Sequence, residues 1–188
     1  MFNENQSYKK ENYTNSKLDN HHYTNCKFHH CDFSQTSFKK ARFIECQFDN
    51  CVVNLPQLDD CRLQECVFQE SKITGANFFQ CDPFLFSIKL ESCLLQYCNF
   101  ANLPLKKGIF NKSIFTECVF SENQMQETQF CYCDLKGTIF HHCNLQKANF
   151  SKAFNYVIDP LTNQIKGATF SMPEALVLLR SLEINLEN

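Results

Sequence analysis

The thirteen cysteines are the side chains of this 188-residue chain with the most chemistry open to them, since thiols form disulfides and bind zinc. Twelve of them share one position of a five-residue repeat, if Cys81 is counted with the residues that precede it. The spacing of the cysteines follows the repeat, and their number is odd. Both observations favour packing in the core over disulfides or metal binding, because free cysteine behaves as a small buried hydrophobe. We therefore expect no disulfide framework and no metal site, with Cys131, beside Tyr132, as the one thiol that faces solvent.

The other potentially reactive side chains do not converge on a site. Zinc would need a third or fourth ligand beside any histidine pair, and the nearby cysteines are expected to point inward. Carboxylates such as Asp59, Asp60 and Asp82 fall on flat outer faces, away from a cleft that would perturb their pKa. None of the four glycines forms a phosphate loop. We expect no catalytic residue, no cofactor and no enzymatic activity. The histidine pairs are His21-His22, His29-His30 and His141-His142.

A period of five residues sets the elements that carry these side chains. Bulky apolar residues occupy every fifth position from Tyr13 to Phe78 and from Leu90 to Phe150, and 14 of the 20 phenylalanines lie there. Two residues before each apolar residue is a smaller position, filled by Cys, Ala, Ser or Thr in most repeats. Neither the helical period of 3.6 nor the strand period of 2 fits this pattern.

The pattern predicts an all-β solenoid. If the large and the small residue of each five both point to a common axis, four sides make a coil of about 20 residues. Coils then stack about 4.8 Å apart through parallel strand hydrogen bonds. Phenylalanines 20 residues apart should stack, as Phe28 on Phe48 on Phe68, and Phe110 on Phe130 on Phe150.

The motifs resemble those of the pentapeptide-repeat family, in which a small residue is followed by Asp or Asn and then by Leu or Phe. The resemblance covers residues 11 to 152 and implies a right-handed quadrilateral β-helix, here of about seven coils, with a C-terminal α-helix. Fold alone does not define function. The motifs that carry it include Cys31-Asp32-Phe33, Ala76-Asn77-Phe78, Cys98-Asn99-Phe100, Cys133-Asp134-Leu135 and Ala148-Asn149-Phe150.

Changes in the pattern divide the chain into five segments. Residues 1–10 are a lead-in, 11–80 the first half of the β-helix, 81–87 a register break, 88–154 the second half, and 155–188 a C-terminal turn, helix and tail. The break holds seven residues where five are expected, and Pro83 cannot donate a ladder hydrogen bond. We expect a bulge or kink at Pro83, with Leu85 pointing inward.

The C-terminal segment predicts a cap and a homodimer interface. Ser171-Met172-Pro173-Glu174 is typical of a capping box with proline in the first turn. The apolar surface that follows exceeds what one cap must bury, although a capped monomer remains an alternative. The residues expected at the cap or interface are Phe170, Met172, Leu176, Leu178, Leu179, Leu182, Ile184 and Leu186, the last two in a possible short strand.

This tail, with the turn at Ile158-Asp159-Pro160, resembles the quinolone-resistance and microcin B17 immunity type of pentapeptide-repeat protein. That resemblance implies a dimer joined at the C-terminal ends. It also implies a partner, DNA gyrase or topoisomerase IV, bound through a DNA-like shape and charge, and protection from poisons of that enzyme.

The surface also supports an alternative, a general protein-interaction scaffold. Residues 11 to 152 hold 15 acidic and 14 basic side chains, so no face is strongly anionic, and no basic stripe predicts direct nucleic-acid binding. No apolar run is long enough for a membrane span, and no signal peptide is evident, so we expect a cytoplasmic protein. Leu94, Ile114, Val119 and Ile139 should form an outward apolar patch.

Overall fold

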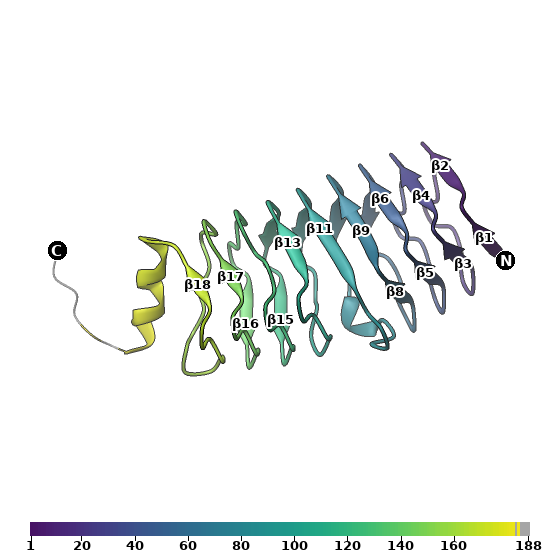
Figure 1. The fold of residues 1–188 in the computed structure, drawn as a ribbon. Helices are drawn as coiled ribbons and strands as arrows, with labels where there is room; N and C mark the ends of the chain where they lie inside the picture. Colours follow the sequence, from purple (N-terminus) through teal and green to yellow (C-terminus); the bar gives the residue numbers. More distant parts are fainter. Residues whose placement is uncertain (183, 185–188) are drawn as a thin grey trace.

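The chain winds into a four-sided parallel β-solenoid of about eight coils, followed by one helix at its C-terminal end (Figure 1). This is the quadrilateral β-helix that the repeat predicts, in a computed structural model that describes residues 1–182 and 184. The coils are slightly more numerous than expected because both ends of the chain join the ladder. The first strand begins at Phe2, and the last coil reaches Phe170.

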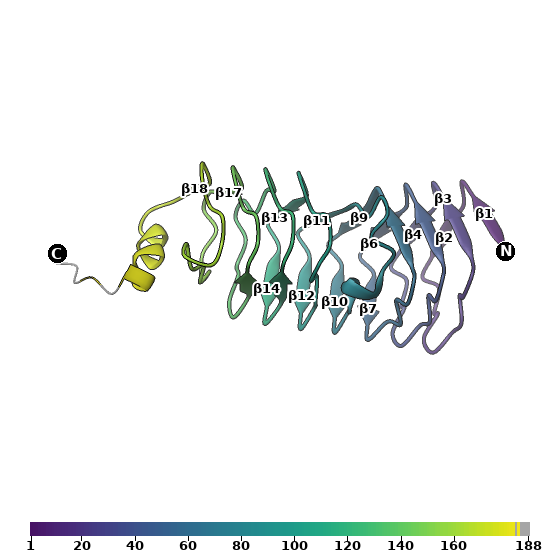
Figure 2. The same ribbon diagram turned by 90° about the horizontal axis from the view of Figure 1, so that it is seen from below.

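Each side of a coil is one short strand or isolated bridge that pairs with the same side of the next coil (Figure 2). The first face begins as a four-stranded sheet and resumes after a gap as bridges from Pro104 through Gln124 and Asn144 to Gln164. The second face is the longest and crosses the whole molecule. The strands of the first face are β1 (Phe2–Glu4), β3 (His22–Thr24), β5 (Arg42–Ile44) and β8 (Arg62–Gln64). Those of the second are β2 (Ser7–Lys9), β4 (Lys27–His29), β6 (Gln47–Asp49), β9 (Cys66–Gln69), β11 (Ile88–Glu91), β13 (Ile109–Asn111), β17 (Asn149–Phe150) and β18 (Thr169–Phe170).

The third and fourth faces complete the square. The third starts with bridges from Asn12 to Asp32 and Val52 and ends with bridges to Asp134 and Phe154. The fourth is built largely of bridges and carries the short 3-10 helix η1 (Phe78–Gln80). Strands of the third face are β7 (Val52–Asn54), β10 (Lys72–Thr74), β12 (Leu94–Gln96) and β14 (Ile114–Thr116), and those of the fourth are β15 (Val119–Ser121) and β16 (Ile139–His141).

The axis is filled by aromatic ladders. Phe28 stacks on Phe48 with ring centroids 5.0 Å apart, and Phe48 stacks on Phe68 at 4.5 Å. In the second half Phe130 stacks on Phe150 at 5.1 Å. Phe110 departs from the expected stack, because its ring meets Phe130 edge-on, at 61° between planes. Both arrangements are favoured pair geometries of aromatic rings, so the core keeps its contacts.

Each corner of the coil is made by a residue in the left-handed region. Glu117, at φ 53°, is one of these corners, and its amide donates to the Lys136 carbonyl of the next coil at 3.1 Å. Left-handed φ costs a non-glycine residue about 1 kcal/mol or more. The chain carries this cost at nearly every fifth residue, and most corner amides gain a partner in the neighbouring coil.

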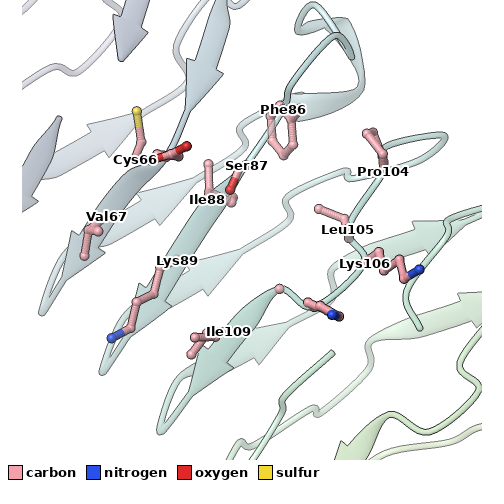
Figure 3. Close-up of a pocket in the computed structure, with 13 residues that line it drawn as sticks. Cys66, Val67, Phe86, Ser87, Ile88, Lys89, Pro104, Leu105, Lys106 and Ile109 are labelled. Carbon is pink, nitrogen blue, oxygen red and sulfur yellow. The ribbon is translucent and has the colours of Figure 1, made fainter. Parts of the chain in front are cut away.

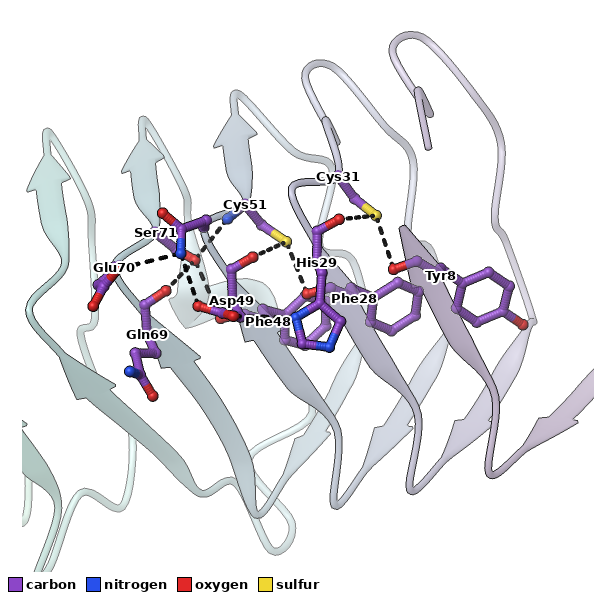
Figure 4. A network of polar contacts seen from close by, with 11 residues as sticks. Tyr8, Phe28, His29, Cys31, Phe48, Asp49, Cys51, Gln69, Glu70 and Ser71 are labelled. Carbon is purple, nitrogen blue, oxygen red and sulfur yellow. Dashed lines mark hydrogen bonds and ion pairs between the residues drawn. The ribbon is translucent and has the colours of Figure 1, made fainter. Parts of the chain in front are cut away.

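The small inward position explains why cysteine, serine and threonine recur there (Figure 4). The Cys51 thiol donates to the carbonyl of Phe28 at 3.3 Å and to that of Asp49 at 3.5 Å. One coil on, the Ser71 hydroxyl donates to the Phe48 carbonyl at 3.2 Å and accepts the Cys51 amide at 3.0 Å. A small side chain with a donor therefore satisfies corner carbonyls that alanine would leave with fewer partners.

The register break is a bulge confined to the first face. β9 pairs with β11 at an offset of 22 residues instead of 20, so two extra residues are absorbed while the second face stays continuous. Pro83 lies in the exposed turn, where its carbonyl accepts the Phe86 amide at 3.3 Å. The expectation that Leu85 points inward is wrong, since Leu85 is 54% exposed and Phe86 is buried at 4%. Leu85 has left-handed φ, and the turn carries its side chain outward.

The C-terminal helix is η2 (Glu174–Leu182), a 3-10 helix where the sequence predicts an α-helix. The Leu176 amide donates to the Pro173 carbonyl three residues back, the bond that defines this tighter helix. Among the described residues Ser171 and Glu174 do not form the hydrogen bonds of the expected capping box, and the Ser171 hydroxyl accepts the amide of Lys152 at 2.9 Å. That bond ties the start of the cap to the preceding coil.

Candidate interaction surface

The outward apolar residues that the sequence singles out occupy two neighbouring rows on adjacent faces. Leu94 on β12 lies directly beside Ile114 on β14, and Val119 on β15 lies beside Ile139 on β16. Leu94, Ile114 and Ile139 are 46%, 42% and 54% exposed, whereas Val119 is half-buried. The structure therefore brings the four predicted residues together as two pairs along one corner of the rod.

Sequence reasoning missed a fifth member of this surface. Val157 bridges to Ile139 in the fourth face and is 61% exposed. Its register changes after Phe154, so it pairs with a residue 18 positions earlier instead of 20, and the five-residue count does not identify it. Leu94, Ile114, Val119, Ile139 and Val157 are called the apolar corner below.

The apolar corner runs to the C-terminal helix. Val157 lines a shallow depression with Tyr156, Pro173, Leu176 and Val177. Lys136, Glu174 and Arg180 line the same depression, so charged and apolar side chains meet there. One largely apolar strip thus extends from β12 and β14 to the end of the solenoid.

The predicted cap residues divide into covering and exposed groups. Phe170 closes the core by stacking on Phe150 at 5.1 Å, and Leu178 also packs against the core. Leu179 is half-buried, and the described helix contains no fully buried residue. The exposed predicted residues are Met172, Leu176, Leu182 and Ile184, at 69%, 43%, 48% and 51%, while Leu186 lies outside the described residues.

The charges on the first face are mixed in sign. His22, Arg42 and Arg62 stand side by side across β3, β5 and β8. Arg62 donates to the Asp82 carboxylate at 2.6 and 3.1 Å, and these bonds hold the pKa of Asp82 below its ordinary value. Burial, and then the neighbouring Arg42, lower the pKa of His22. Phe84 of the bulge covers the Arg62 guanidinium at 5.4 Å, an arrangement that the sequence did not predict.

The cysteines follow the packing prediction. Twelve are buried, and Cys131 is the one that is partly exposed. Burial raises the pKa of Cys46, Cys51 and Cys133 to about 12, which keeps these thiols protonated near neutral pH. Thiolate is the reactive form of cysteine, so these side chains are suited to packing and weak hydrogen bonding.

A groove opens beside the bulge, at the corner between the first and second faces (Figure 3). Its volume is about 290 Å³. One wall is formed by Glu65, Cys66 and Val67, and the opposite wall by residues 104–109. Phe86 to Lys89 lie between these walls.

No helix in the described residues has both the length and the apolar character needed to cross a membrane.

The repeat, the coil geometry and the buried small positions define a pentapeptide-repeat solenoid. Family models agree: one for a pentapeptide repeat region matches residues 21–100, and one for eight pentapeptide repeats matches residues 124–154. Together they cover more than half of the chain, which therefore belongs to the pentapeptide-repeat family.

Two solved structures show the same fold. A trypsin-treated form of QnrB1, a plasmid-mediated fluoroquinolone resistance protein, matches with a TM-score of 0.59 and 17% identity, covering all of both chains. A second trypsin-treated form matches at 0.57 and 16%, covering 100% of this chain and 99% of the other. HetL, a pentapeptide repeat protein involved in heterocyst differentiation regulation from the cyanobacterium Nostoc, has a TM-score of 0.38 and 15% identity, over 88% and 84%. A comparison with curated proteins gives no match.

Proposed function

We propose that this chain is a non-enzymatic protein that binds a type II topoisomerase, DNA gyrase or topoisomerase IV, as a DNA-like mimic and protects it from poisons. The observation that carries the proposal is the full-length match of its fold to QnrB1, a fluoroquinolone resistance protein. Eight steps of about 4.8 Å make a rod of about 38 Å, close to one helical turn of duplex DNA at about 34–36 Å. The rod therefore suits a surface shaped for a short duplex.

Binding of this kind would rest on shape and apolar contact more than on charge. Duplex DNA carries one negative charge per about 1.7 Å of its axis, whereas residues 11 to 152 balance 15 acidic against 14 basic side chains. Few counterions would be released on binding, so the affinity should change little between low and high salt. The apolar corner supplies the contact surface that the charges do not.

We also propose a homodimer joined through the C-terminal segment. Its support is the exposure of Met172, Leu176 and Leu182 on a short helix that a single chain leaves half-covered. The test is sedimentation equilibrium of the wild type and of Leu176→Glu, with Leu161→Glu as the matched control, because Leu161 is 71% exposed and lies outside the helix. A monomeric wild type, or equal dimerisation of both variants, would remove the dimer from the proposal.

The test of the main proposal is a pair of gyrase assays with added protein. Supercoiling and poison-stabilised DNA cleavage are measured at low and high salt. We expect less poison-stabilised cleavage as protein is added, at both salt concentrations. Rescue only at low salt would point to a charge-based mimic, and no effect in either assay at high excess would reject topoisomerase as the target.

The apolar corner favours a second candidate, a general protein-interaction scaffold without topoisomerase activity. Contiguous apolar surface marks protein contacts more often than isolated exposed residues do. Replacing Ile114 and Ile139 by lysine should remove a partner captured by the wild type, while Gln124→Lys on the first face should not. Capture that survives the double substitution would exclude the apolar corner as the binding surface.

A further inference from the structure

The groove beside the bulge lacks one set of ladder hydrogen bonds. In neighbouring coils, backbone carbonyls on this side accept backbone amides from the preceding coil. The Leu105 amide donates to the Gln124 carbonyl at 2.8 Å, and the Lys107 amide donates to the Gln126 carbonyl at 2.9 Å. One coil further the same two bonds recur at Asn144 and Gln146, at 2.9 and 3.0 Å. These bonds show which two carbonyls of each coil require donors.

The corresponding carbonyls in the groove are those of Pro104 and Lys106. In this pattern the donor lies 19 residues before the carbonyl, so the expected donors are the amides of Leu85 and Ser87 in the bulged coil. The Ser87 amide donates to the Leu63 carbonyl instead, and the Leu85 amide does not donate to Pro104. Within the described residues neither Pro104 nor Lys106 accepts a backbone hydrogen bond. The bulge therefore leaves two in-register acceptors along one wall of a groove about 290 Å³ in volume.

The charge around these acceptors selects the occupant. Lys89, Lys106 and Lys107 line the groove against a single carboxylate, Glu65. Lys89 and Lys107 have carboxylate neighbours at 3.5 and 3.9 Å, and Lys106 has no ion pair among the described residues. The groove thus combines a lysine without an ion pair, Lys106, with carbonyls that need N–H donors. A phosphodiester backbone supplies anionic oxygens but no N–H groups along its chain, whereas an extended acidic peptide supplies both.

We propose that this groove binds a short extended segment of a partner protein, with apolar residues toward the core and acidic residues toward the lysines. Alternate amides of the segment donate to the carbonyls of Pro104 and Lys106, as the missing side of the coil would do. Peptides bind to sheet edges elsewhere by this addition of a strand. The site is independent of the topoisomerase proposal, because it lies on the corner between the first and second faces, away from the apolar corner.

The probe is the acetylated, amidated peptide Asp-Val-Glu-Val-Asp, titrated to several millimolar while carbon-13 NMR follows the carbonyls of Pro104 and Lys106. We expect saturable shifts of both resonances. N-methylation of the two valine amides should abolish them, while N-methylation of the glutamate and the last aspartate should leave them. Unshifted carbonyls, or equal binding of the two methylated peptides, would overturn the proposal.

Charge reversal tests the lysines with a matched control. The double variant Lys106→Glu and Lys107→Glu should weaken binding by about tenfold or more, since attractive pairs become repulsive. The matched double variant Lys147→Glu and Lys166→Glu, at the same two repeat positions two and three coils on, should leave binding within about twofold. An equal loss of peptide affinity in both double variants would show non-specific attraction to surface charge. A single-stranded oligonucleotide that displaces the peptide and itself keeps the Pro104 and Lys106 carbonyl resonances shifted would assign the groove to nucleic acid. Either result contradicts the proposal.

Discussion

Truncation of Phe120 to alanine should cause one of the largest losses of stability available in this chain. Its side chain has no exposed surface and stacks between Phe100 at 4.8 Å and Phe140 at 5.2 Å. Phe130 meets it edge-on at 5.8 Å. Truncation of a buried phenylalanine costs about 3–5 kcal/mol, and each lost aromatic pair adds to that cost. We expect a loss of about 4–5 kcal/mol in the free energy of unfolding.

Urea unfolding measures this loss directly. With a slope of about 2 kcal/mol per molar urea, the midpoint should fall by about 2 M. Phe84→Ala is the control, because Phe84 is 62% exposed and its truncation should cost about 1 kcal/mol or less, the worth of its contact with the Arg62 guanidinium. A loss below about 2 kcal/mol at Phe120, or equal losses in both variants, would refute the view that a continuous aromatic ladder stabilises the solenoid.

Three further predictions concern the cysteines. Iodoacetamide at pH 8 should label Cys131 alone in the native protein and all thirteen thiols after denaturation, because the other twelve are buried; mass spectrometry that finds a second labelled thiol in the native state would contradict this. The free energy of unfolding should fall as pH rises above about 9. Burial raises the pKa of Cys46 and Cys51 from the ordinary 9.0 to about 12, so these thiols lose their protons at lower pH in the unfolded chain than in the folded one. Deprotonation above about pH 9 therefore favours the unfolded chain. Thermal denaturation between pH 8 and 11 measures this effect, and a constant melting temperature would contradict it. Cys51→Ser should change the unfolding free energy by less than about 1 kcal/mol, because Ser71 fills the same position one coil on, whereas Cys51→Leu should cost about 1–3 kcal/mol by overpacking. Similar effects of the two substitutions, measured in urea, would show that the position does not restrict size.

The sequence predicts the solenoid well because one short rule repeats along it. Inward and outward positions follow from the five-residue period, and Phe28, Phe48 and Cys51 are buried where the period places them. The period also predicts the apolar pairs Leu94–Ile114 and Val119–Ile139, since parallel pairing places residues 20 apart side by side.

The remaining features lie where the period changes. At the bulge, two extra residues can be absorbed in several ways, so periodicity alone cannot decide between Leu85 and Phe86 as the inward residue. After Phe154 the offset shortens, and Val157 joins the apolar corner without a sequence signal. The groove depends on two missing hydrogen bonds at Pro104 and Lys106, which arise from tertiary structure and leave no mark in composition.

The ladder also starts and ends outside the range that the motif indicates. Asn3 takes the central position of β1 in place of a bulky residue, yet its strand pairs with β3 in full register. Near the other end Asn163 fills a small inward position and donates to the Phe140 carbonyl at 2.9 Å. Backbone pairing therefore tolerates polar substitutions at terminal coils, where the motif is weakest.

Poison-stabilised DNA cleavage by purified gyrase, measured with increasing amounts of the full chain at low and high salt, tests the central proposal most directly. A protein that replaces duplex DNA through shape and apolar contact predicts a dose-dependent fall in cleaved DNA at both salt concentrations. That fall should be lost in the double variant Ile114→Lys and Ile139→Lys and kept in Gln124→Lys. Cleavage that stays constant at high excess of the wild-type chain would contradict the proposal.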